Sequence, residues 1–156
     1  AVLFAASPLT AKTLAYPSAD NASFVIDHPA DWEVEPGEEV GDYVTLTGPT
    51  GAVVQLRTRP GDQEAVKQAI QDSVDFIEET FSQVKMGEPE ALEHRGMKTW
   101  MVGGTGKDED GEQVVFLMYL FALSDGNIAD IWYSVLAADE EGMDAAAQVL
   151  GSFREP

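Results

Sequence analysis

The sequence predicts one α+β domain, in which a central antiparallel β-sheet carries one long helix and one short C-terminal helix. Three features predict it: a long amphipathic stretch after Asp62, strand-like runs on both sides of that stretch, and a short helical pattern near the C-terminus. The chain has 156 residues and no cysteine. A domain of this length buries enough apolar surface to fold without disulfides or bound metals.

The strand-like runs alternate apolar and polar residues or are rich in β-branched and aromatic residues, and turn residues separate them. They span residues 22–29, 42–47, 52–58, 97–102, 113–123 and 128–137. The run 113–123 is apolar on both faces, which predicts a central strand covered on both sides. Residues 103–111 are rich in glycine and acidic side chains, and we expect them to form a long hairpin connection.

The amphipathic stretch begins at Asp62, a favourable N-cap residue, and contains no glycine or proline before Gly87. Its apolar residues recur at steps of three and four: Val66, Ile70, Val74, Ile77, Phe81 and Val84. This spacing predicts a helix of about 20 residues that packs one apolar face on the sheet. A shorter helix is expected over residues 139–150, with Phe153 fastening it to the sheet.

Residues 1–11 form an apolar, uncharged run that contains Pro8 and stops before Lys12. Such a run is typical of the end of a secretory signal. We therefore expect residues 12–156 to form the domain and to be exported to the periplasm or the outside of a bacterial cell. The alternatives for residues 1–11 are a first strand or a disordered arm. The absence of cysteine fits a bacterial envelope better than a eukaryotic extracellular module.

The formal net charge is −19, from 28 acidic and 9 basic residues, and the acidic residues are scattered along the chain. Phosphate backbones and anionic lipid headgroups bind through lysine and arginine, so we expect neither nucleic-acid binding nor binding to a membrane surface. Membrane insertion is not expected either, because the apolar run 113–123 is too short to span a bilayer as a helix. Solubility is the favoured explanation of the charge, and a surface for cations or for a basic partner is the alternative.

The order of landmarks along the chain resembles that of the PsbP-like superfamily, named for an extrinsic subunit of photosystem II. The opening has the form aromatic-x-Ile-x-x-Pro-x-x-Trp, from Phe24 through Ile26 and Pro29 to Trp32, and the domain ends on Ser152 and Phe153. The resemblance covers residues 23–153. It implies an antiparallel sheet between helices, an α/β/α sandwich, that serves mostly as an adaptor or assembly module and has no shared catalytic residues.

The sequence contains no recognisable catalytic motif. It lacks a cysteine nucleophile and a Gly-x-Ser-x-Gly elbow, and the glycine-rich residues 103–107 do not have the spacing of a phosphate-binding loop. His28 is predicted at the rim of a strand and His94 in an exposed loop or strand, so we expect neither to act as a base. These absences predict a protein that is not an enzyme.

Two arginines are the first candidates for ligand binding. Arg57 and Arg59 lie on one face of the strand 52–58 and its continuation, because alternate residues of a strand point to the same side. Together they could hold a carboxylate or a sulfate. Pairing with nearby acidic side chains is the favoured alternative.

Two tryptophans are the second candidates. Trp100 shares a strand face with Lys98, and Trp132 shares one with Asp130 and Ser134. Polar neighbours around both rings suggest a partly hydrated aromatic groove that could bind a small ligand. If helices cover both faces of the sheet, both rings belong to the core, and this is the favoured interpretation.

The acidic turn containing Asp108, Asp110 and Glu112 offers carboxylates and a glycine, which is the chemistry that calcium prefers. The acidic residues are adjacent rather than spread over a twelve-residue loop, so at most weak calcium binding is expected. A charged hairpin tip that prevents edge pairing is the favoured alternative. We expect no other cofactor.

These observations favour an exported, non-catalytic adaptor, assembly or chaperone-like module that acts on a protein partner through its surface. The alternative is a carrier of a small ligand or a cation in the cell envelope. A hydrolase that uses carboxylates alone is the least favoured function.

Overall fold

The computed structural model describes residues 11–39 and 41–156. The export prediction falls on residues 1–10, which lie outside the described residues, and Ala11 is already the first residue of a strand. The described part contains ten strands and two helices. In chain order they are β1 (Ala11–Tyr16), β2 (Phe24–Pro29), β3 (Glu33–Glu35), β4 (Val44–Thr47), β5 (Val53–Pro60), α1 (Gln63–Thr80), β6 (Ser82–Met86), β7 (Glu90–His94), β8 (Met97–Lys107), β9 (Gln113–Ala122), β10 (Asn127–Leu136) and α2 (Glu140–Gly151).

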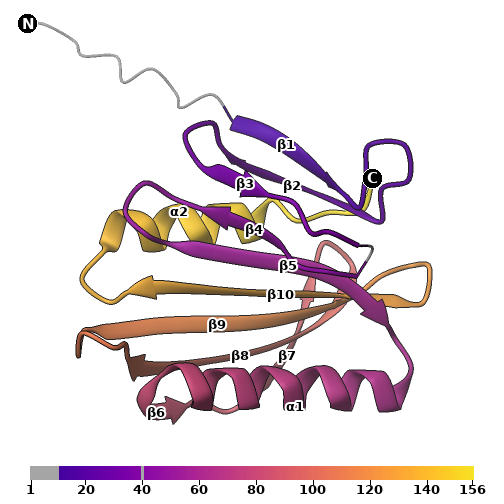
Figure 1. Cartoon of the computed structure of the whole chain (residues 1–156). Helices are drawn as coiled ribbons and strands as arrows, with labels where there is room; N and C mark the ends of the chain where they lie inside the picture. The colour runs from indigo at the N-terminus through magenta and orange to yellow at the C-terminus, as the bar shows by residue number, and fades with distance from the viewer. Residues whose placement is uncertain (1–10, 40) are drawn as a thin grey trace, which may run out of the picture.

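The main sheet is antiparallel and has the strand order β3-β4-β5-β10-β9-β8-β6, with β7 pairing with the other half of β8. A separate two-stranded sheet is formed by β1 and β2. Helix α1 covers one face of the main sheet, while α2 and the β1–β2 hairpin lie on the other (Figure 1). This arrangement confirms the predicted α+β fold with helices on both sides of the sheet. No helix among the described residues is long and apolar enough to cross a membrane.

The larger part of the core lies between the sheet, α2 and the β1–β2 hairpin. Its centre is a group of stacked rings, in which Phe153 lies 4.1 Å from Phe121 and 4.9 Å from Phe24, measured between ring centroids. Trp32, from the opening motif, is also buried here. Residues from both ends of the chain therefore meet, and Phe153 fastens the end of α2 to the sheet as predicted.

The predicted extent of the long helix is wrong at its C-terminal end. Asp62 caps the helix by accepting a hydrogen bond from the amide of Ala65 at 2.9 Å, but α1 ends at Thr80. Phe81 is extended, and residues 82–86 form strand β6 on the edge of β8. The apolar spacing of Phe81 and Val84 is compatible with a helix, but pairing with β8 satisfies the backbone of this segment instead.

The glycine-rich residues 103–107 were also predicted wrongly, because they belong to β8 and are not a hairpin connection. A Cβ atom on Gly104 would lie 2.6 Å from the carbonyl oxygen of Lys85 in β6 and 2.7 Å from the ring of Phe116 in β9. Glycine here permits close approach of a neighbouring strand and a ring, and does not mark a turn. The short strands β3 and β7 had no sequence signal that we recognised.

Replacing Gly104 with alanine is expected to lower the free energy of unfolding by about 2 kcal/mol, because the new methyl group meets backbone that cannot move freely. Gly151→Ala is the matched control, since a Cβ atom at Gly151 meets nothing within 4 Å, and its effect should stay within about 0.5 kcal/mol. Urea unfolding measures both. Equal stabilities of the two variants would contradict the steric role of Gly104.

Candidate ligand-binding pocket

A cleft of about 410 Å³ lies between α1 and the main sheet, and we call it the α1 cleft. Its lining residues come from α1, β5, β9, β10 and the segment before β4. They are Tyr43, Gln55, Arg57, Asp72, Ser73, Phe76, Ile77, Phe116, Leu117, Met118 and Trp132. The helix buries Ala69, Ser73 and Ile77, and of these Ser73 and Ile77 line the cleft.

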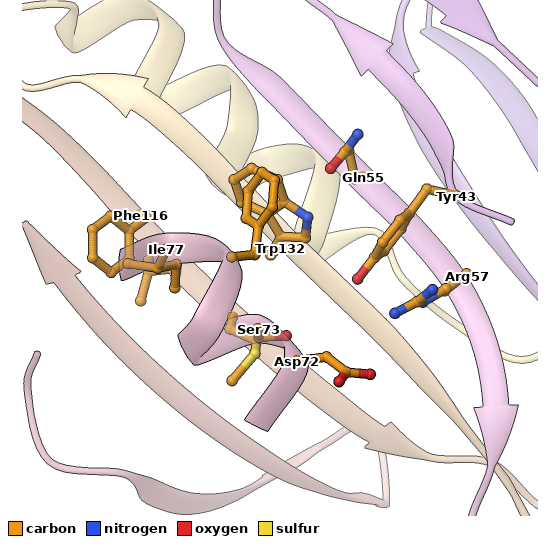
Figure 2. Close-up of a pocket in the computed structure, with 11 residues that line it drawn as sticks. Tyr43, Gln55, Arg57, Asp72, Ser73, Ile77, Phe116 and Trp132 are labelled. Carbon is orange, nitrogen blue, oxygen red and sulfur yellow. The ribbon is translucent and has the colours of Figure 1, made fainter. Parts of the chain in front are cut away.

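The α1 cleft is polar at one end and apolar at the other (Figure 2). The hydroxyl of Tyr43, the guanidinium of Arg57 and the carboxylate of Asp72 gather at the polar end, while Phe116 and Ile77 lie at the apolar end (Figure 2). Trp132 lies between the two ends. A space with this polarity suits an amphiphilic molecule.

Below the polar end lies Asp130, a carboxylate in the middle of β10 that has no exposed surface. Its Oδ2 atom accepts a hydrogen bond from Tyr43 at 3.1 Å and one from Nε of Arg57 at 3.3 Å, and Nε of Arg59 lies 3.7 Å away. Its Oδ1 atom has no hydrogen-bond partner among the described residues. Burial raises the pKa of Asp130, and the two arginines and the tyrosine oppose that shift only in part.

The antiparallel register of β5 and β10 brings Asp130 and Arg57 together. Asp130 of β10 lies directly opposite Arg57 of β5, so their side chains leave the same face of the sheet next to each other. The guanidinium of Arg57 also lies 4.0 Å above the ring of Tyr43, which holds its plane in place. Burial, together with the charge of Asp130, raises the pKa of the Tyr43 hydroxyl. Tyr43 is therefore a neutral donor to Asp130 over the physiological range.

The second arginine connects the sheet to the helix. Nη2 of Arg59 lies 2.7 Å from Oδ2 of Asp72 in α1, and the amide of Gln68 donates to Oδ1 of the same carboxylate at 2.7 Å. The hydrogen bond from Arg59 lowers the pKa of Asp72, so this carboxylate remains ionised. Arg57 and Arg59 thus both have the acidic partners that the sequence analysis favoured.

The structure separates the two tryptophans. Trp132 lines the α1 cleft and lies 5.2 Å from the ring of Phe76. Trp100 is on the same face of the sheet but packs with Ala69 and Leu120 in a smaller cluster beneath α1. Ligand binding stays a prediction for all four residues; Arg57 and Trp132 line the α1 cleft, whereas Trp100 and Arg59 do not.

The sequence analysis missed the contributions of Tyr43, Asp72, Ser73 and Phe76 to the cleft. The signal that was available is Asp130, an acidic residue inside an otherwise apolar strand run. A buried acid of this kind requires a partner. The contributing residues from α1 gave no such signal, since an amphipathic helix exposes many polar residues.

The acidic turn between β8 and β9 uses a carboxylate for its own structure. Oδ1 of Asp108 accepts hydrogen bonds from the amides of Asp110 and Glu112 at 3.0 and 2.9 Å. Across residues 11–39 and 41–156, no three His, Cys, Asp or Glu side chains are placed to hold a metal ion together. Calcium binding by Asp108, Asp110 and Glu112 stays a prediction without support from this geometry.

Both histidines contact backbone carbonyl oxygens. Nε2 of His94 lies 2.9 Å from the carbonyl oxygen of Phe153, and Nδ1 of the buried His28 lies 2.9 Å from that of Pro29. Neither ring hydrogen-bonds to a hydroxyl group within the described part of the chain. The geometry therefore does not pair either histidine with a nucleophile.

The sequence matches no family model and no curated protein. Solved structures do match the fold. Cyanobacterial PsbP (CyanoP) from Synechocystis sp. PCC 6803 superposes with a TM-score of 0.65 at 10% identity, over 100% of this chain and 98% of that one. The chain has a PsbP-like fold.

Two further structures share this PsbP-like fold. The Saccharomyces cerevisiae Ran-binding protein Mog1p has a TM-score of 0.60 at 10% identity, over 94% of this chain and 96% of that one. A Bacteroides thetaiotaomicron VPI-5482 protein has a TM-score of 0.61 at 12% identity. The match covers 93% of this chain and 48% of that protein, so this chain spans about half its length. At these identities the likeness concerns the fold.

Proposed function

We propose that this chain is a non-enzymatic binding module and that it holds a small amphiphilic ligand in the α1 cleft. The observation that carries the proposal is the cleft itself, about 410 Å³ in volume, with an aromatic and apolar wall and polar groups gathered at one end. Small-molecule sites have this size and composition. Tyr43 and Arg57 contact Asp130, and Arg59 contacts Asp72, through ion pairs and hydrogen bonds.

An adaptor that binds a protein partner is the second candidate. It is supported by the PsbP-like fold, which also occurs in a Ran-binding protein. It agrees with the expectation of a surface-acting assembly or chaperone-like module. Export to the bacterial envelope belongs to both candidates and rests on the apolar run 1–11 and on the absence of cysteine.

Filling the α1 cleft tests the proposal directly. The neutral fluorophore N-phenyl-1-naphthylamine should bind the unmodified chain and gain fluorescence, since its rings leave water for an apolar wall. Ser73→Leu places a larger side chain in the lining of the cleft and should weaken this binding by about tenfold or more. Fluorescence titration gives both affinities, and circular dichroism checks that the variant is folded.

The matched control is Ala147→Leu, which adds the same side chain on α2, at a smaller groove of about 210 Å³ on the opposite face of the sheet. Its affinity for the fluorophore should equal that of the unmodified chain. An equal loss in both variants, or no binding to the unmodified chain, would remove the small-ligand function and leave the adaptor as the better candidate.

A further inference from the structure

The polar end of the α1 cleft has hydrogen-bond donors without acceptors. A guanidinium carries five N–H donors, and Arg57 uses Nε to reach Asp130 at 3.3 Å. Among the described residues, its terminal nitrogens have no acceptor. The stack on Tyr43 fixes the orientation of these nitrogens beside the cleft. A ligand that accepts hydrogen bonds would complete this end.

The acceptors at the same end are Asp72 and Asp130, and each is paired with an arginine. Both oxygens of Asp72 accept hydrogen bonds, one from Arg59 and one from Gln68. Asp130 has no exposed surface, so a ligand in the cleft cannot reach it. A cationic ligand could therefore reach only Asp72, whose charge Arg59 already offsets, and it would lie next to the positive charge of Arg57.

The remainder of the cleft favours an apolar body. Ile77 and Phe116 lie at the far end, with Trp132 between them and the polar groups (Figure 2). Phe76 and Trp132 are tilted by 58° with their ring centroids 5.2 Å apart. Phe76 is 45% exposed, so an apolar group placed against it would remove aromatic surface from water.

We infer that the α1 cleft selects small amphiphilic carboxylates, with the carboxylate on Arg57 and the apolar body against Trp132 and Phe76. The inference rests on the proposed function and specifies its ligand class. A planar carboxylate can accept two hydrogen bonds from one guanidinium, which is the arrangement that arginine favours.

Three probes with one apolar body and different head groups test the inference: 4-phenylbutyrate, 4-phenylbutan-1-ol and 4-phenylbutylamine. Their affinities are measured by calorimetry at about 0.15 M salt, where the distant charges of this acidic chain are largely screened. The carboxylate should bind at least about tenfold more tightly than the alcohol, because it forms charge-assisted hydrogen bonds. The amine should bind most weakly.

Arg57→Lys retains a positive charge next to Asp130 but removes the planar pair of donors. In this variant we expect the carboxylate to bind at most about threefold more tightly than the alcohol, while the affinity for the alcohol changes little. Arg154→Lys is the matched control, since Arg154 pairs with Asp27 and does not line the cleft. Its preference should equal that of the unmodified chain.

The outcomes separate the inference from the proposed function. If the alcohol or the amine binds as tightly as the carboxylate, the inference is wrong. If none of the three binds while the naphthylamine still does, the ligand class is again wrong and the binding function stands. If Arg57→Lys leaves the carboxylate preference unchanged, Arg57 is not the group that recognises it.

Discussion

Phe153→Ala is expected to lower the free energy of unfolding by about 4 kcal/mol, the largest effect of any single substitution proposed for this chain. Phe153 has no exposed surface; its ring stacks on Phe121 and packs at a tilt against Phe24. Its removal leaves a cavity between the end of α2, β2 and β9, and it separates the C-terminal segment from the sheet. Urea unfolding followed by circular dichroism measures the change.

Phe76→Ala is the control for this prediction, because it removes the same side chain from a position on α1 where the ring is 45% exposed. Its cost should stay near 1 kcal/mol, since less buried surface is lost and solvent fills the space. A cost for Phe153→Ala below that of Phe76→Ala would contradict the assignment of Phe153 as the residue that fastens α2 to the sheet.

Arg57→Met is expected to lower the free energy of unfolding by about 3 kcal/mol at neutral pH, because it leaves the carboxylate of Asp130 buried without its main partner. Adding Asp130→Asn in the same chain should recover at least half of this loss, since the amide carries no charge. Denaturant unfolding of the two variants and the unmodified chain gives the comparison. A cost below about 1 kcal/mol for Arg57→Met would contradict the role of Arg57 in compensating the buried charge.

The destabilisation caused by Arg57→Met should increase as the pH rises. The pKa of Asp130 is raised by burial in the folded state, so the folded chain holds this proton more tightly than the unfolded chain does. The stability gained from binding this proton is complete below the pKa of an unfolded aspartate, about 3.9. It is lost as the pH rises through the pKa of Asp130 in the folded chain. Removing Arg57 raises that folded pKa further. The defect of Arg57→Met should therefore be small near pH 4 and complete near pH 8. A defect that grows as the pH falls would contradict this linkage.

Local patterns in the sequence predicted most of the elements. Period-two alternation located β2, richness in Val, Leu and Thr located β4 and β5, and Asp62 marked the start of α1. The resemblance in the opening motif and the ending led to the PsbP-like fold. The same alternation placed Arg57 and Arg59 on one face of β5, and Asp130 and Trp132 on one face of β10. These inferences succeed because the direction of a side chain within a strand depends on its own strand alone.

The sequence predictions were wrong where pairing with a neighbouring strand determined the structure of a segment. Phe81 and Val84 continue a helical spacing, yet their segment pairs with the edge of β8. Gly104 and Gly106 resemble turn residues, yet they let β6 and aromatic rings approach β8 closely. In each case the local pattern was compatible with two structures, and a hydrogen-bonding edge from a different part of the chain selected one of them.

The sequence by itself determined the class of fold, the start of the long helix and the side of each strand on which its charged and aromatic residues lie. The α1 cleft was decided only by the tertiary structure. Asp130 meets Arg57 across 73 residues of chain, because β5 and β10 are adjacent and in that register. Strand order and register depend on how all apolar faces are buried together, so no local pattern reveals which acid meets which arginine. The cleft forms where α1 lies over β5, β9 and β10, which come together only in the folded chain.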